Sequence, residues 1–254
     1  MQEIINMMTQ RNSISKRKGY ARRYTTALNA GEEVQSIHQY EDNSQNRQLV
    51  YVIGGKLYAD NDTTQTDITG TLTIQNHRDN HVCLASYDGN LIGTDNISPP
   101  FLFPTLVSGQ GVDMTTRGNC PTAAKYVVAF KEHIFFLNIV DSADGLRYPY
   151  RVVHSEPGSP YQGYGVTNND LNRNQAITGA FAVGDALVIG QQFSLWYAMQ
   201  DSYGSGTTSP FAYKQLDSRV GLMSNDAVVV TARGTFFIDR RGIYVIESSQ
   251  GISP

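Results

Sequence analysis

Short apolar segments that end at glycine-containing turns recur along the chain, and residues 176–247 show this pattern most clearly. β-Branched and aromatic residues fill these segments, as they do in β-strands. Strands are expected at residues 177–183, 186–197, 226–231, 235–239 and 243–247. Turns are expected at Gly184-Asp185, Gly190-Gln191-Gln192, Arg233-Gly234 and Arg240-Arg241-Gly242. Glycine supplies the positive φ that tight hairpins require, so the last three segments predict an antiparallel meander, the building unit of a propeller blade or a barrel.

Three earlier hairpins have the same construction. Their turns are expected at Gly54-Gly55, Asp88-Gly89-Asn90 and Lys131-Glu132-His133. The five hairpin-centred units are unequally spaced, because polar segments of different lengths lie between the strands. We expect residues 60–69 to be a connector, residues 97–122 to be an insertion between blades and residues 155–174 to be a loop. Unequal spacing of a recurrent strand-turn-strand unit favours an all-β, β-propeller-like fold that is incomplete or degenerate. A two-sheet sandwich gives the same spacing and stays open as an alternative.

No window keeps apolar residues at helical spacing, so we expect no helix longer than about three turns. Apolar residues between the turns should form the core. The expected core positions are Val50, Val52, Leu57, Val127, Phe135, Leu187, Ile189, Val228, Val230, Phe236 and Ile238. Trp196 should also be largely buried.

Cations crowd the start of a chain whose formal net charge is only −3. Glu3 is the only acid before Glu32. The candidate residues for a subunit interface or a DNA contact are Arg11, Lys16, Arg17, Lys18, Arg22 and Arg23. We therefore expect residues 1–30 to be a basic N-terminal arm and residues 31–254 to be the β-propeller-like domain. The arm either is solvated, lies across a neighbouring subunit or contacts nucleic acid.

The cysteines and the apolar runs favour a protein made in a cytoplasm. Cys83 and Cys120 lie far apart without CxxC spacing, which indicates free thiols in a reducing compartment. No apolar run approaches the roughly 18 residues of a membrane span. The first eight residues lack the apolar segment of a signal peptide.

Three possible ligand sites were weighed and none was favoured, so no metal, cofactor or catalytic residue is predicted. His77, His81 and Cys83 have short spacings, but no second cluster completes four ligands. The acidic segment from residue 60 has Gln65 and Thr71 where a calcium loop needs Gly and Glu. Gly109 and Gly111 are not followed by the Lys-Ser/Thr pair of a phosphate-binding loop.

Two stretches of the sequence carry a resemblance to a known family. The C-terminal run consists of AITG at 176–179, LVIG at 187–190, SLW at 194–196, VGLMS at 220–224, AVVV at 227–230, FFID at 236–239 and GIY at 242–244. The N-terminal segment is SISKRKGY at 13–20, a basic tract before Gly and an aromatic residue. In this order they are similar to the propeller proteins of short-tailed phages that form the tail nozzle or plug the head-to-tail channel. Those proteins are usually much longer than this chain.

The resemblance implies a structural virion protein and not an enzyme. It implies a homo-oligomer in a six-fold ring, with other phage tail or portal-adaptor proteins and packaged double-stranded DNA as partners, and a role in DNA retention and ejection. A receptor- or glycan-binding propeller of the virion is an alternative, based on the tyrosine-rich loop at 161–164. A glycoside hydrolase is a third, which would need two of Asp185, Asp226 and Asp239 to lie close together.

Overall fold

A computed structural model describes residues 7–10, 13–16, 28, 31–76, 81–116, 119–160, 162, 164, 168–200, 210–247 and 251–253. The chain divides into two units, Met1–Gly31 and Glu32–Pro254. In the first unit, strand β1 (Met7–Gln10) pairs antiparallel with β2 (Ser13–Lys16). The second unit contains five sheets.

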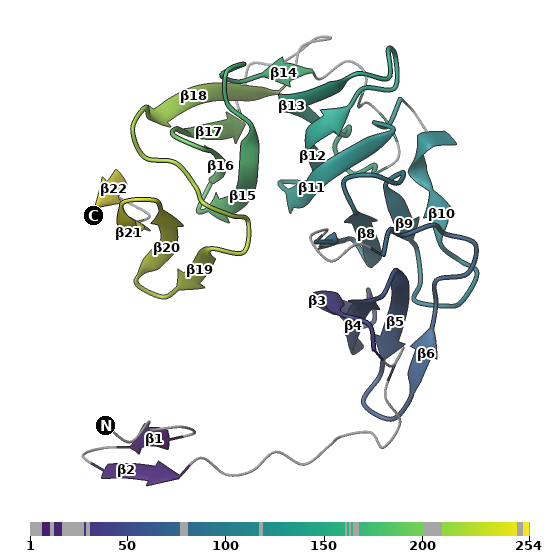
Figure 1. The fold of residues 1–254 in the computed structure, drawn as a ribbon. Coiled ribbons are helices and arrows are strands. Elements are labelled where there is room, and N and C mark those ends of the chain that lie inside the picture. Colours follow the sequence, from purple (N-terminus) through teal and green to yellow (C-terminus); the bar gives the residue numbers. More distant parts are fainter. Residues whose placement is uncertain are drawn as a thin grey trace. The chain divides into compact units, whose positions relative to one another are not determined.

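Each of these sheets has four strands that are consecutive in sequence and pair antiparallel, which is the construction of a propeller blade (Figure 1). Blade 1 consists of β3 (Val34–Glu41), β4 (Arg47–Ile53), β5 (Lys56–Asp60) and β6 (Gln65–Asp67). Blade 2 consists of β7 (Cys83–Tyr87), β8 (Asn90–Thr94), β9 (Phe101–Phe103) and β10 (Val112–Asp113). Blade 3 consists of β11 (Ala123–Phe130), β12 (His133–Val140), β13 (Arg147–His154) and β14 (Asn169–Asp170). Blade 4 consists of β15 (Ile177–Val183), β16 (Ala186–Gln191), β17 (Leu195–Gln200) and β18 (Phe211–Asp217). Blade 5 consists of β19 (Val228–Thr231), β20 (Gly234–Asp239), β21 (Gly242–Glu247) and β22 (Gly251–Ser253).

The five blades confirm the prediction of an all-β, propeller-like fold. The helical positions within the described ranges are all 3-10, in the turn η1 (Met114–Thr116) and at Tyr164, so the expected lack of long helices is also confirmed for those residues. No helical segment of the described part is long and apolar enough to cross a membrane.

The predicted hairpin turns, apart from the second turn of blade 4, are where the sequence places them. At the β4–β5 turn, Gly54 and Gly55 have φ values of 57° and 74°. Lys131 and Glu132 at the β11–β12 turn also have positive φ, 43° and 61°, which side chains adopt less readily than glycine.

The outer strands of the blades correct the sequence-based reading. Residues 60–69, 97–122 and 155–174 were expected to be connectors, but they contain β6, β9 with β10, and β14. These strands have only two or three residues, which is too short for an alternating pattern to be seen. In blade 4 the second turn lies at residues 192–194, where Gln191 N donates to Ser194 O (2.8 Å), slightly later than expected.

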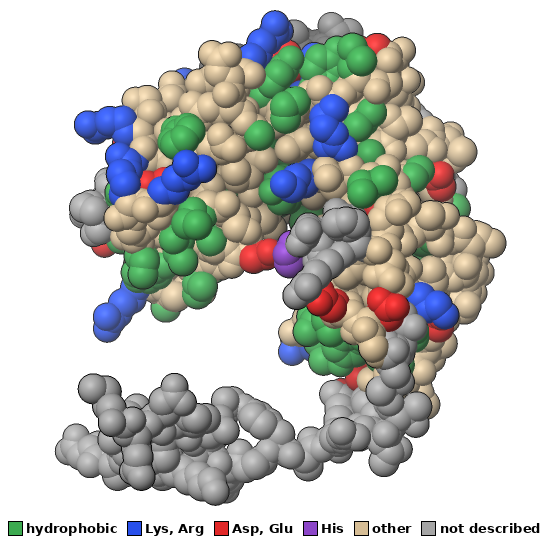
Figure 2. Space-filling model, in the orientation of Figure 1, with side chains coloured by type: hydrophobic (Ala, Val, Ile, Leu, Met, Phe, Trp, Pro, Cys, Tyr) green, Lys and Arg blue, Asp and Glu red, His purple; other side chains and the backbone are tan. Residues whose placement is uncertain are grey.

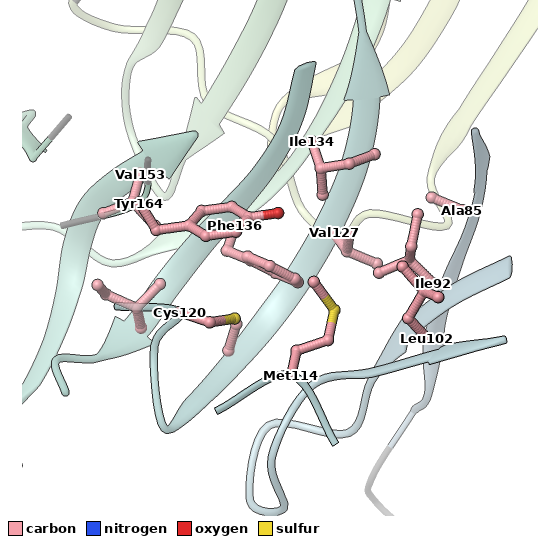
Figure 3. Close-up of a cluster of buried hydrophobic side chains, with 12 residues drawn as sticks. Ala85, Ile92, Leu102, Met114, Cys120, Val127, Ile134, Phe136, Val153 and Tyr164 are labelled. Atoms are coloured by element: carbon pink, nitrogen blue, oxygen red, sulfur yellow. The ribbon is translucent and has the colours of Figure 1, made fainter. Parts of the chain in front are cut away.

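Four apolar cores join neighbouring blades. Figure 3 shows the core between blades 2 and 3, where Ile92 and Leu102 meet Val127 and Phe136. Equivalent cores lie between blades 1 and 2, between blades 3 and 4, and between blades 4 and 5. Among the described residues no such cluster joins blade 5 to blade 1. One face of blade 5 therefore has no neighbouring blade in the described part of the chain.

Blade 5 is also where the predicted core fails. The positions in blades 1, 3 and 4 are confirmed as buried: Val50, Val52, Leu57, Val127, Phe135, Leu187 and Ile189. Val230 and Ile238 were expected in the core, but they are 70% and 41% exposed. Val228 and Phe236 are only partly buried, and Phe237 is the buried apolar residue of β20.

Trp196 was expected to be largely buried, but it packs at the edge of the core between blades 3 and 4 and stays partly exposed. Its indole Nε1 donates to Gln191 Oε1 at 2.9 Å. The polar end of the ring is satisfied by this bond rather than placed in the apolar interior.

Candidate functional site

The first strands of the blades surround the centre of the second unit. Strand β11 contacts both β7 and β15. Strands β3, β11, β15 and β19, each the first of its blade, can be followed in Figure 1. Because all five blades have the same strand order, these first strands begin at the same end of the central axis. Side chains from several blades can therefore meet at that end.

A pocket of about 280 Å³ lies there, and we call it the axial pocket. Residues at or near the beginnings of β7, β11 and β15, together with the segment that leads into β19, form its wall. The lining residues are His81, Val82, Cys83, Asn96, Lys125, Tyr126, Thr178, Met223, Ser224, Asn225 and Asp226.

Close packing holds the segment before β19 against blade 4. Asn225 Oδ1 accepts a hydrogen bond from Ala180 N at 3.1 Å. A Cβ atom added at Gly179 would lie 2.6 Å from Asn225 Cα, so only glycine lets the two backbones approach this closely. Ser224 Oγ accepts a hydrogen bond from Asp226 N at 3.3 Å. These contacts fix the wall that carries the Asp226 carboxylate.

The thiol and the phenol in the pocket are both kept neutral. Burial raises the pKa of Cys83 to about 11, and the charge of Asp226 adds to this effect. The thiol is 3.4 Å from the Val127 carbonyl oxygen, to which it donates. Burial also raises the pKa of Tyr126, with further contributions from Cys83 and Asp226. Because the thiolate is the reactive form, Cys83 is not suited to act as a nucleophile.

The axial pocket also presents one cation and one anion. Lys125 and Asp226 are both exposed on it, and in the part of the chain that the structure describes neither side chain forms an ion pair. The Lys125 Nζ atom lies 5.4 Å from the centroid of the Tyr126 ring. The Tyr126 hydroxyl has no hydrogen-bond partner among the described residues. The pocket therefore has unused capacity for polar and charged groups.

Of the three residues weighed as a metal set, His81 and Cys83 line the axial pocket, whereas His77 lies outside the described residues. The described residues include no group of three or more His, Cys, Asp or Glu side chains that could hold a metal ion.

A second feature is an apolar sheet face on blade 5. The register of β19, β20 and β21 aligns Val229 with Phe236 and Phe236 with Val245, and it aligns Ile238 with Ile243. We call these five residues the fifth-blade face. Val229 is 60% exposed and Ile243 is 65% exposed. Figure 2 shows hydrophobic side chains at the surface over this part of the molecule.

The opposite side of the same sheet is covered. Phe237 and Ile246 pack against Phe181 and Val188 of blade 4, and Phe237 stacks on Tyr244 with ring centroids 5.7 Å apart. The fifth-blade face has the apolar construction of a blade-to-blade contact, but no described residue of another blade covers it.

The structure does not test the predicted basic site. Arg11, Arg17, Lys18, Arg22 and Arg23 lie outside the described residues. Lys16 is the last residue of β2, opposite Met7, and nothing is described of its side chain.

The residues on which the glycan-binding and glycoside hydrolase alternatives depend have partners within the chain. Tyr164 is 1% exposed, stacks near Phe136 at 5.2 Å and donates to Pro160 O at 2.7 Å, so it is not available to stack on a sugar. Asp185 pairs with Lys131 at 3.2 Å.

Asp239 pairs with Arg241 at 2.9 Å and also accepts a hydrogen bond from Gly221 N at 3.2 Å. Only Asp226 of the three acids considered lines the axial pocket.

Sequence reasoning missed the polar residues of the axial pocket, above all Lys125, Tyr126 and Asn225. Each is ordinary in its local sequence. Their shared signal is positional, because each lies within three residues of the start of the first strand of a blade. That signal is visible only after the blades have been delimited.

Comparisons with known proteins agree with the fold. No protein family matches the sequence, and no curated protein matches it. Among solved structures, the chain is similar to the extracellular domain of a putative hybrid two-component system from B. thetaiotaomicron, with 10% identity and a TM-score of 0.58 over 92% of this chain and 28% of that one. It is also similar to the dihydro-heme d1 dehydrogenase NirN in complex with DHE, with 13% identity and a TM-score of 0.50 over 87% of this chain and 48% of that one. The chain thus spans less than half the length of either protein, and at these identities the likeness shows the fold alone.

Proposed function

We propose that this chain is a structural subunit of a tailed-bacteriophage virion. It acts in the tail nozzle or head-to-tail channel, in a ring of copies that forms the DNA conduit and helps to retain packaged DNA. Its role is mechanical and not catalytic. The phage assignment rests on the sequence resemblance at residues 13–20 and 176–244, and the assembly role rests mainly on the fifth-blade face.

The fifth-blade face is the structural observation that supports the assembly part of the proposal. Fully burying a Val, Ile or Phe side chain contributes roughly 1.5–3 kcal/mol. Covering Val229, Ile238 and Ile243 would therefore stabilise a complex by a few kcal/mol before the costs of association. An apolar patch of this kind on a folded protein marks an interaction site.

The assembly part of the proposal can be tested by replacing the two most exposed members of this face with Glu. We expect the parent protein to form rings in negative-stain electron microscopy and a matching mass in analytical ultracentrifugation. Val229→Glu combined with Ile243→Glu should give monomers with an unchanged β-sheet circular dichroism spectrum, because burying unpaired carboxylates is costly.

Leu146→Glu is the matched control, since Leu146 is 59% exposed in blade 3. This variant should assemble as the parent does. A parent protein that stays monomeric at all concentrations, or a double variant that assembles normally, would exclude this face from assembly.

The basic arm gives the test of the DNA role. Neutralising Arg17, Lys18, Arg22 and Arg23 together should leave the fold intact, because unpaired cations are not placed in a core. We expect this variant to impair ring assembly or DNA retention in virions.

If the arm contacts DNA, binding by the parent should weaken steeply with salt, and the quadruple variant should show a smaller slope. A contact with protein should instead depend on acidic residues of the partner. Virions that assemble and retain DNA as well with the variant would remove the arm from the mechanism.

A further inference from the structure

We propose that the axial pocket is a binding site for a small zwitterion of amino-acid size, whose anionic group lies at Lys125 and whose cationic group lies at Asp226. The site goes beyond the structural role proposed above. It lies within one chain, at the beginnings of the first strands of blades 2, 3 and 4 and in the segment before β19.

The volume sets the size of the ligand. Pockets for drug-sized ligands occupy roughly 300–1,000 Å³. The axial pocket has about 280 Å³, just below that range. A molecule of amino-acid size fits this space, whereas an oligosaccharide would extend outside it.

The charges set its chemistry. Lys125 and Asp226 line one small pocket, yet they form no ion pair with each other or with any other described residue. A ligand that carries both signs makes a charge-assisted hydrogen bond at each end. A ligand with a single charge makes only one of these two bonds and leaves the other side chain solvated, so it gains less on binding.

Neutral groups complete the site. Asn225 Oδ1 is occupied by Ala180 N at 3.1 Å, so the amide presents its Nδ2 donors. The Tyr126 phenol, which burial keeps protonated, offers one donor and one acceptor. The Cys83 thiol is protonated and donates a hydrogen bond to the Val127 carbonyl oxygen, so the site binds its ligand without covalent chemistry.

Isothermal titration calorimetry with the full chain tests the proposal. The probes are the common free amino acids, each compared with a matched amine that lacks the carboxylate and a matched carboxylic acid that lacks the amine. We expect at least one amino acid to bind, and its two matched probes to bind at least about tenfold more weakly, because a hydrogen bond to a charged group is worth that factor or more.

Two variants assign the ends of the ligand. Lys125→Met and Asp226→Asn should each weaken binding of the amino acid by about tenfold or more. In Asp226→Asn the matched carboxylic acid should bind about as well as the amino acid, which a merely structural role of Asp226 would not produce. Lys214→Met is the control, because Lys214 is exposed in β18 and does not line the pocket. Circular dichroism checks that all variants are folded.

Three results would overturn the proposal: no amino acid binds to the parent, the singly charged probes bind as tightly as the amino acid, or both pocket variants bind like the parent. None of these results bears on ring assembly. The fifth-blade face shares no residue with the axial pocket.

Discussion

Mild acid should destabilise the contact between blades 3 and 4, because two histidines are buried there side by side. His133 and His154 are each 1% exposed, and their ring centroids are 5.1 Å apart. The Nδ1 atoms of both rings lie at hydrogen-bond distance from the same acceptor, the Ser155 carbonyl oxygen, at 2.6 Å and 2.9 Å. Each ring therefore donates its Nδ1 proton to this oxygen. A second proton on either ring would place a charge in a site surrounded by the Phe135 and Phe211 rings.

Burial lowers the pKa of His154 from 6.5 to about 4, the Ser155 carbonyl opposes this shift, and the neighbouring His133 adds to it. Burial lowers the pKa of His133 as well. The unfolded chain thus takes up protons near pH 6.5, whereas folded His154 does so only near pH 4. Stability from this group is complete above pH 6.5 and falls as the pH drops toward 4. At about 1.4 kcal/mol per pH unit, the loss for His154 reaches about 3 kcal/mol, a large part of a typical total of roughly 5–15 kcal/mol.

Urea denaturation between pH 7.5 and pH 4 measures this loss directly. His154→Asn keeps an N–H donor for the Ser155 carbonyl but cannot be protonated, so its free energy of unfolding should depend less on pH in this window. The hydrogen bond from Arg151 lowers the pKa of Asp170 below the ordinary 3.8, so this carboxylate acts at lower pH. A parent protein equally stable at pH 7 and pH 4.5, or an equally steep fall in His154→Asn, would refute the reasoning.

Three substitutions test the packing. Phe237→Ala should cost about 3–5 kcal/mol in urea denaturation, whereas Ile238→Ala on the uncovered side should cost about 1 kcal/mol or less; equal costs would contradict the assigned faces. Arg151→Met should cost about 1–3 kcal/mol at pH 7, because Asp141 and Asp170 lose a cation at 2.7 Å and 2.6 Å. The cost should shrink as the pH falls below 3.8 toward the lowered pKa of Asp170, and a cost that does not change with pH would argue against an electrostatic cause. Gly93→Ala should cost about 1–3 kcal/mol by thermal denaturation, because its Cβ would lie 2.2 Å from a ring carbon of Phe101, and an unchanged melting temperature would show that the ring can move.

The parts of the fold that depend on local sequence were predictable. Hairpin turns such as Gly54-Gly55 and Asp88-Gly89 have positive φ at both positions, and Gly-Gly and Asp-Gly are residue pairs typical of such turns. The strands on either side of these turns were therefore found. Outer strands such as β10 and β14 pair through only two residues each, so the sheet that holds them, and not their own sequence, makes them strands.

The faces of blade 5 and the axial pocket were not predictable. In β19 and β20 the residues on both sides of the sheet are apolar, so the sequence lacks the alternation that would separate Phe237 from Ile238. The pocket needs Lys125, Asn225 and Asp226 to come together from blade 3 and from the segment before blade 5. These residues are far apart in the sequence, and only the packing of the blades around the axis brings them together.

The chain of four cores makes the second unit a linear array with two free ends. Blades 2, 3 and 4 each share a core on both sides, whereas each terminal blade shares only one. In such nearest-neighbour systems the ends fray first, and capping one end protects every unit behind it. Amide hydrogen exchange should accordingly be slowest in β12 and β16 and faster in β20. A molecule that binds to blade 5 would then also slow amide hydrogen exchange in blades that it does not contact.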